Sequence, residues 1–163
     1  MDRVDSLTRV VILGSTGSIG RSALSVIEHD GGARLRAWGL SAHTRWRDLA
    51  AQAEAHRPRY VAATDPELAR PLERALRGTG VEVLAGLDGL VRMVQDPGTD
   101  RVLSAIVGAV GLRGTWAALE AGKTVALANK ETLVVAGPLV MDLARSRSRE
   151  IARHLSDSFC GFA

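Results

Sequence analysis

Several classes of protein are disfavoured by what the 163-residue sequence lacks. Its single cysteine, Cys160, cannot form a disulfide within the chain, so a reducing cytoplasm is the expected location. Apolar runs such as 125–128 are far too short to cross a bilayer, and no basic leader followed by apolar residues opens the chain. Aromatic residues make up only 4%, and the arginines are scattered among acids without forming a stripe. We therefore expect neither a membrane segment nor a nucleic-acid partner.

The four histidines lack the spacing of a metal site or of a catalytic pair. Each is isolated, no two are arranged as His-x-x-x-His, and no Ser–His–Asp arrangement can be argued. We therefore predict no catalytic residue and no metal ligand in the sequence up to residue 145.

The most informative feature present is an apolar run that leads into a glycine-rich turn at residues 9–20. Three glycines recur at intervals of three residues: Gly14, Gly17 and Gly20. Three hydroxyl side chains between them would add hydrogen-bond donors: Ser15, Thr16 and Ser18. A strand, a glycine turn and a helix in this order direct backbone N–H groups toward an anion, typically the pyrophosphate of a dinucleotide. The alternative is a tight turn that binds nothing.

Strand and helix signals alternate along the rest of the sequence. Strands are predicted within 9–13 and at 35–40, 59–63, 81–84, 102–107 and 124–127. Helices are predicted from residue 19 and at 44–57, 67–77, 87–95 and 112–119. This alternation predicts an α/β, Rossmann-like, doubly wound fold, with a mostly parallel sheet and helices on both faces.

The segment after the second predicted strand lacks an acid where an NAD site usually has one. Such a site places Asp or Glu about 20 residues beyond the turn to bind the ribose hydroxyls. Here no acid occurs between residue 40 and Asp48. A neutral-to-basic pocket suits a 2′-phosphate, so we predict NADPH rather than NADH, with Arg45 or His43 near the phosphate. The alternative for both residues is an exposed position in a loop.

A third candidate site follows the strand at 124–127, where Asn129, Lys130 and Glu131 occur in succession. Lys130 could hold an anionic substrate and Asn129 could bind a cofactor amide or ribose, because open α/β sheets bind ligands at the carboxyl ends of their strands. Alternatively, Asn129 caps a helix whose dipole favours Glu131. The small residues at 108–111 either admit a cofactor or only join a strand to a helix.

Taken together, these segments resemble the 1-deoxy-D-xylulose 5-phosphate reductoisomerase family over about residues 8–145. The shared segments are 14–20, 58–60, 105–111, 121–124 and 127–131. The resemblance implies that six residues contact NADPH: Thr16, Gly17, Ser18, Ile19, Asn129 and Glu131. It also implies that Lys130 contacts the sugar-phosphate substrate. Three residues replace a Gly-Lys-Asn-like triplet of the family and are predicted to line the cofactor site: His43, Thr44 and Arg45.

The resemblance also implies a reaction. The family rearranges 1-deoxy-D-xylulose 5-phosphate and reduces the intermediate with NADPH to 2-C-methyl-D-erythritol 4-phosphate, a step of non-mevalonate isoprenoid biosynthesis. It uses Mg²⁺ or Mn²⁺ and works as a homodimer.

The resemblance ends near residue 146. The family continues into a Pro-Val-Asp-Ser-Glu-His segment whose Asp and Glu bind the metal, whereas here Phe159 follows Asp157 and Ser158. We therefore expect an NADPH-binding domain at 1–145 and a divergent tail at 146–163, with the metal-binding and catalytic domain missing and the chain alone inactive. The alternative is a stand-alone dinucleotide-binding regulatory or sensor module, which the abrupt loss of the family pattern disfavours.

Overall fold

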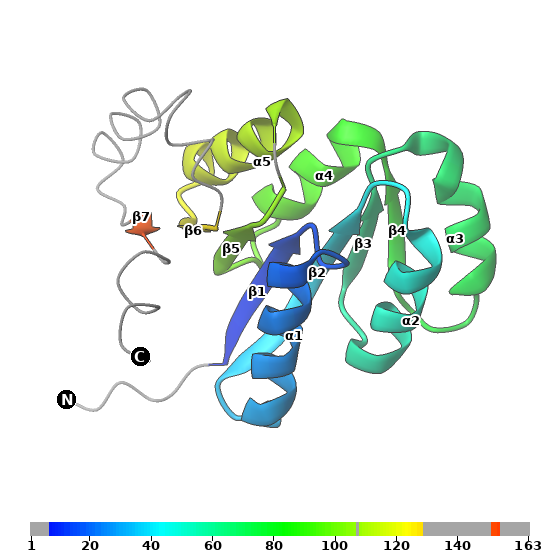
Figure 1. Cartoon of the computed structure of the whole chain (residues 1–163), viewed down its shortest axis with the longest axis horizontal. Coiled ribbons are helices and arrows are strands. Elements are labelled where there is room, and N and C mark those ends of the chain that lie inside the picture. Colours follow the sequence, from blue (N-terminus) through cyan, green and yellow to red (C-terminus); the bar gives the residue numbers. More distant parts are fainter. Residues whose placement is uncertain (1–6, 107, 129–150, 154–163) are drawn as a thin grey trace.

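Strands and helices alternate along the chain in a computed structural model, which describes residues 7–106, 108–128 and 151–153 (Figure 1). The strands are β1 (Thr8–Leu13), β2 (Leu35–Ala42), β3 (Tyr60–Ala63), β4 (Glu82–Ala85), β5 (Arg101–Ser104), β6 (Thr124–Leu127) and β7 (Ile151–Arg153). The helices are α1 (Ser18–Asp30), α2 (Trp46–His56), the 3₁₀ turn η1 (Pro66–Leu68), α3 (Ala69–Ala75), α4 (Gly86–Gln95) and α5 (Ala109–Glu120).

The seven strands in the described residues form one sheet, in the order β4-β3-β2-β1-β5-β6-β7. Every neighbouring pair is parallel, which confirms the doubly wound arrangement expected from the sequence. From β1 the chain proceeds outward to β4, and α4 then returns it to β5 on the other side of β1. The strand order therefore reverses between β1 and β5, and open α/β sheets bind their ligands beside such a switch point.

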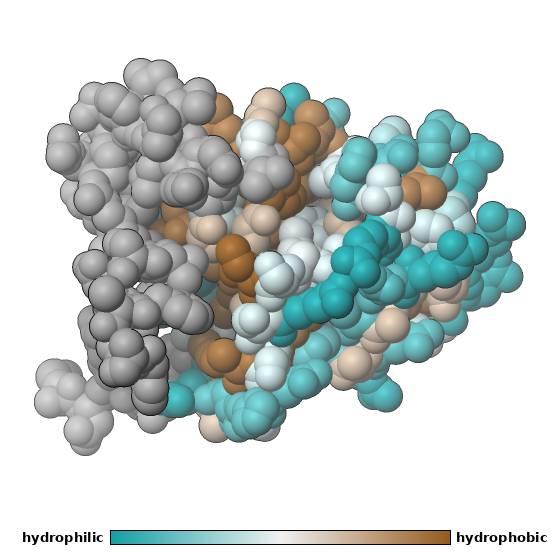
Figure 2. Space-filling view, in the orientation of Figure 1, coloured by the Kyte–Doolittle hydropathy of each residue, from teal (hydrophilic) through white to brown (hydrophobic). Residues whose placement is uncertain are grey.

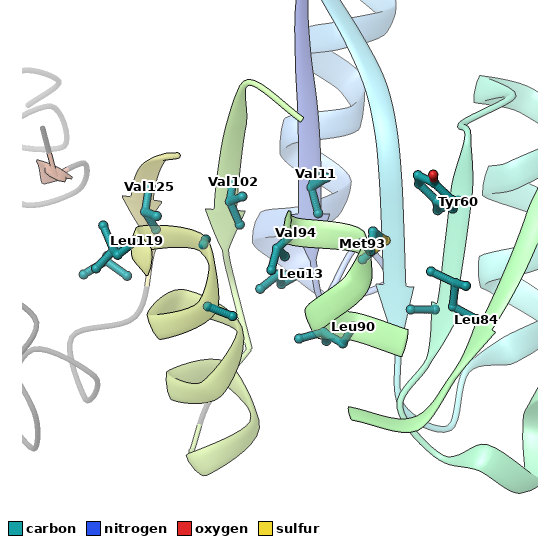
Figure 3. Close-up of a cluster of buried hydrophobic side chains, with 14 residues drawn as sticks. Val11, Leu13, Tyr60, Leu84, Leu90, Met93, Val94, Val102, Leu119 and Val125 are labelled. Atoms are coloured by element: carbon teal, nitrogen blue, oxygen red, sulfur yellow. The ribbon is translucent and has the colours of Figure 1, made fainter. Parts of the chain in front are cut away.

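Helices cover both faces of the sheet. Successive side chains of β1 point to opposite faces, so they belong to two different cores. Val11 and Leu13 belong to the cluster that contains α4 and α5, whereas Ile12 belongs to the cluster that contains α1, α2 and α3. All three side chains are fully buried. Figure 3 shows the first cluster, in which Val94 of α4 lies beside Leu13 of β1 and Met93 lies toward β2, with its sulfur 2.6 Å from a Cβ built on Gly39. Because successive strand residues point to opposite faces, one apolar strand supplies both cores.

The predicted elements are all present, and the differences lie mainly at their ends. The predicted strand and β6 coincide at Thr124–Leu127. The predicted helix at 67–77 was only partly right, because it is divided into η1 and α3. Asp65 fixes the 3₁₀ turn, since its Oδ1 accepts a hydrogen bond of 3.1 Å from the N–H of Glu67.

The strand predicted at 102–107 is shorter than expected, because β5 already ends at Ser104. Ala105 and Ile106 leave the sheet and pack against the glycine turn: a Cβ built on Gly14 would lie 3.1 Å from Cγ1 of Ile106. β7 adds a short strand beside β6 within the 146–163 stretch, where the sequence predicted no element. No helix in the described part of the chain is long and apolar enough to span a membrane.

Candidate functional site

The glycine turn joins the carboxyl end of β1 to α1 and is held by β2. The N–H of Gly14 donates to Oγ of Ser41 at 3.1 Å, and the N–H of Ser15 donates to the carbonyl oxygen of Ser41 at 2.9 Å. Gly14 has φ +82°, a backbone conformation that glycine adopts without strain. Ile106 packs against Gly14 from the loop after β5. The turn is thus fixed from both sides of the switch point.

Ser15 faces the interior, so the prediction that its hydroxyl is a donor at the ligand site was wrong. Its side chain is fully buried, and its Oγ donates to Oε1 of Gln52 at 2.7 Å. In return, Nε2 of Gln52 donates to the carbonyl oxygen of Ser15 at 2.9 Å. Ser15 therefore anchors α2 to the turn. The sequence could not show this contact, because its two partners lie far apart along the chain.

The N-terminus of α1 is open to an anion. Its N-cap residue, Gly17, makes no side-chain capping bond, and no acid lies in the first turn. Gly17, Ser18 and Ile19 are exposed, whereas Thr16 is buried. A Cβ built on Gly17 would have only the carbonyl oxygen of Gly14 within contact distance, at 3.4 Å. The first N–H groups of a helix lack internal partners and carry its positive dipole end, so this surface suits a phosphate.

The two basic residues predicted near the 2′-phosphate, His43 and Arg45, point in different directions. His43, Thr44 and Arg45 are all exposed. Nδ1 of His43 lies 3.0 Å from Oγ1 of Thr64, which directs the ring toward β3. Arg45 turns the other way, and its Nη1 donates to the carbonyl oxygen of Thr16 at 3.2 Å. Of these two basic residues, Arg45 is the one that contacts the glycine turn.

Two residues that the sequence analysis did not assign to the site, Arg21 and Asp48, share contacts with Arg45. Nε of Arg21 donates to the same carbonyl oxygen of Thr16 at 2.9 Å. The carboxylate of Asp48 lies 2.9 Å from Nη2 of Arg45 and 3.7 Å from Nη2 of Arg21. The three-residue spacing of Arg45 and Asp48 was a usable signal for an ion pair, whereas the approach of Arg21 depends on the tertiary fold. Figure 2 shows hydrophilic residues over α2 and α3 on the visible face, and hydrophobic residues toward α5.

The small residues at 108–111 mostly begin α5. Gly108 precedes the helix with φ +79°, and residues 109–111 form its first turn. A Cβ built on Gly111 would overlap the carbonyl oxygen of Ile106. Close packing of helix against loop therefore explains Gly111, in agreement with the structural alternative.

The remaining predicted residues, Asn129, Lys130 and Glu131, lie outside the described residues and stay predictions. Within the described ranges, no group of three or more His, Cys, Asp or Glu residues could hold a metal ion.

Two carboxylates with lowered pKa values lie near the amino ends of the strands, away from the glycine turn at the carboxyl end of β1. Burial alone would raise the pKa of Asp96, but hydrogen bonds from Trp38, Tyr60 and the N–H of Gly98 outweigh it and lower the pKa. The pKa of Asp100 is lowered chiefly by the side chain of Arg9, whose Nε lies 3.0 Å from the carboxylate. Asp100 directly precedes β5, so these acids lie near the amino ends of strands and stabilise the fold.

Comparison with known proteins identifies relatives of this architecture. The family model for 1-deoxy-D-xylulose 5-phosphate reductoisomerase matches residues 10–137. The reductoisomerase of Heliobacterium modesticaldum is 50% identical over 143 residues, which are 86% of this chain and 36% of that protein. The chain thus spans about a third of the length of the curated relatives it matches.

Solved structures agree with this match. The enzyme from Zymomonas mobilis in complex with NADPH is 41% identical, with a TM-score of 0.84 over 90% of this chain and 38% of that one. A second structure, in complex with NADPH, fosmidomycin and magnesium, is 38% identical, with a TM-score of 0.84 over 89% of this chain and 36% of that one. The alternative of a stand-alone sensor module receives no support from these comparisons.

Proposed function

Because the chain belongs to the 1-deoxy-D-xylulose 5-phosphate reductoisomerase family, we propose that residues 1–145 form its NADPH-binding domain. The observation that carries this proposal is the uncapped N-terminus of α1, which lies beside the switch point between β1 and β5. The open space above Gly17 supports it, because a dinucleotide pyrophosphate must approach the backbone there closely.

Each described site residue has a proposed role toward the cofactor. The backbone N–H groups of Gly17, Ser18 and Ile19 would hold the pyrophosphate. Thr16 positions the turn, since its carbonyl oxygen accepts hydrogen bonds from two guanidinium groups. His43, Thr44 and Arg45 would border the adenosine ribose, with Arg45 directed toward the 2′-phosphate. A bound NADPH supplies the hydride for a reduction; these residues bind and orient it.

The activity of the whole protein is a wider proposal. Outside the described residues, Asn129 and Glu131 would contact the cofactor and Lys130 the sugar-phosphate substrate. The described residues supply no site for the Mg²⁺ or Mn²⁺ that the family resemblance implies, so we place the metal outside the described residues. We further propose that the whole protein is a cytoplasmic homodimer that converts 1-deoxy-D-xylulose 5-phosphate to 2-C-methyl-D-erythritol 4-phosphate, and that this chain alone does not catalyse the reaction.

Calorimetric titration of the purified chain with NADPH and with NADH tests the binding proposal. We expect saturable binding of NADPH and weaker binding of NADH. If NADPH shows no saturable binding to a folded chain, the proposal is wrong.

A chimaera tests the wider proposal. Residues 10–128 of this chain would replace the matching part of the Zymomonas mobilis relative. We expect NADPH oxidation that depends on 1-deoxy-D-xylulose 5-phosphate, and none from this chain alone. A folded chimaera without turnover, or turnover by the chain alone, would contradict the proposal.

A further inference from the structure

Two guanidinium groups converge on one carboxylate and one carbonyl oxygen beside the glycine turn. Arg21 comes from α1, whereas Arg45 and Asp48 come from the start of α2. Both arginines donate to the carbonyl oxygen of Thr16, at 2.9 Å and 3.2 Å. Both also lie near the carboxylate of Asp48, at 3.7 Å and 2.9 Å.

Stability gives little reason for this arrangement. The three side chains are about half exposed, at 52% for Arg21, 55% for Arg45 and 46% for Asp48. Exposed ion pairs of this kind contribute little to the free energy of unfolding, because solvent screens them and ordering long side chains costs entropy. The shared carbonyl oxygen, however, holds both guanidiniums in fixed positions on the ligand side of the turn.

The position of the cluster suits one part of a dinucleotide. In doubly wound folds the adenosine ribose lies at the carboxyl end of the second strand, where an acid binds the 2′-hydroxyl or an arginine accommodates a 2′-phosphate. The first acid after β2 here is Asp48, and two arginines already surround its carboxylate. Asp48 is therefore occupied by cations and poorly placed to accept a hydrogen bond from a ribose hydroxyl.

The charges of the cluster favour a phosphate. Two guanidiniums and one carboxylate leave a net positive charge, and guanidiniums bind phosphate oxygens with charge-assisted hydrogen bonds. We propose that Arg21 binds the 2′-phosphate of NADPH together with Arg45, and that Asp48 is a positioning residue that holds both guanidiniums in the free protein. This inference rests on the proposed function and adds to it a specificity determinant from α1.

Calorimetry with two ligand pairs tests the role of Arg21. The pairs are NADPH with NADH, and adenosine 2′,5′-bisphosphate with 5′-AMP, which differ only in the 2′-phosphate. We expect Arg21→Ser to weaken NADPH and the bisphosphate roughly tenfold, with NADH and 5′-AMP nearly unchanged. Arg21→Lys keeps the charge and should recover part of the loss.

Arg92→Ser is the matched control, because Arg92 is also an exposed helical arginine, 2.8 Å from Glu82. It should bind all four ligands like the parent chain. Equal weakening of both members of a pair by Arg21→Ser, or no weakening, would overturn the inference.

Asp48→Asn tests the positioning role. It removes the carboxylate that holds the two guanidiniums in place, so NADPH should bind roughly threefold more weakly, while NADH stays unchanged. An Asp48→Asn chain that binds NADPH as tightly as the parent chain, or more tightly, would contradict this role.

Different results would refute the proposed function and the inference about Arg21. If the parent chain binds neither NADPH nor NADH, the proposed function fails. If it binds NADPH but Arg21→Ser keeps the full preference for NADPH, only the inference about Arg21 fails.

Discussion

The carbonyl oxygen of Gly14 occupies the space that a Cβ atom on Gly20 would need. The same Cβ would approach Cα of Ser15 to 2.5 Å. Both obstacles are backbone atoms, so they cannot turn away as a flexible side chain can. The first turn of α1 therefore approaches the end of β1 closely because residue 20 is a glycine.

We expect Gly20→Ala to destabilise the domain by about 3 kcal/mol, since backbone must shift to accommodate the methyl group. Urea unfolding followed by circular dichroism measures this loss. Gly17→Ala is the matched control, because its Cβ would meet only one atom, at 3.4 Å. Similar unfolding free energies for the parent and Gly20→Ala chains would show that the turn is less tightly packed than described.

Gly17→Ala should separate binding from folding. Gly17 has φ −76°, which alanine also adopts, so the unfolding free energy should change little. The added methyl group stands where the pyrophosphate would approach the backbone, so NADPH affinity should fall roughly tenfold or more. Calorimetric titration measures the affinity. A Gly17→Ala chain that binds NADPH normally would place the pyrophosphate elsewhere.

The hydrogen bonds between Ser15 and Gln52 predict a loss of stability when Gln52 is truncated. Gln52→Ala removes the side chain that donates to the Ser15 carbonyl oxygen and accepts from the buried Ser15 hydroxyl, which keeps only a longer bond of 3.3 Å to the carbonyl oxygen of Ser41. We expect the free energy of unfolding to fall by about 2 kcal/mol, the usual cost of an unsatisfied buried group. Gln95→Ala, at an exposed position, is the control and should have little effect. Equal effects of the two variants in urea unfolding would contradict the assigned hydrogen bonds.

The lowered pKa values of Asp96 and Asp100 predict a loss of stability in acid. A carboxyl whose pKa is lower in the folded chain stabilises the fold at pH values above its unfolded pKa. That contribution should be lost as the pH falls from about 4, the ordinary pKa of aspartate, through the lower folded pKa. Urea midpoints measured from about pH 6 to pH 2.5 test this. Asp100→Asn should flatten part of the dependence; an unchanged profile would show that Asp100 does not contribute.

Much of the fold could be predicted from local pattern. Apolar runs between glycine and proline punctuation located the strands up to residue 128, because buried parallel strands are short and continuously apolar. The ends were less certain, since tertiary contacts decide them. Ala105 and Ile106 are as apolar as β5, yet they leave the sheet to pack against Gly14.

The candidate site was predictable only where its residues adjoin one another in the sequence. The glycine turn was predicted in this way, whereas Arg45 was predicted from its place after the second strand, where no acid occurs before Asp48. Arg21 and Gln52 were missed, because their partners, Asp48 and Ser15, lie in other elements. Ser15 was wrongly placed at the ligand site because sequence alone does not tell which hydroxyl of a turn faces inward.

Nuclear magnetic resonance of the ¹⁵N-labelled chain during titration with NADPH tests whether the glycine turn binds the dinucleotide. We predict the largest shifts at the backbone amides of Gly17, Ser18 and Ile19, with further shifts at Arg21 and Arg45. NADH should move the first group and leave the two arginines nearly unchanged. Shifts centred on other elements, or none at saturating NADPH, would contradict the claim that this turn binds the dinucleotide.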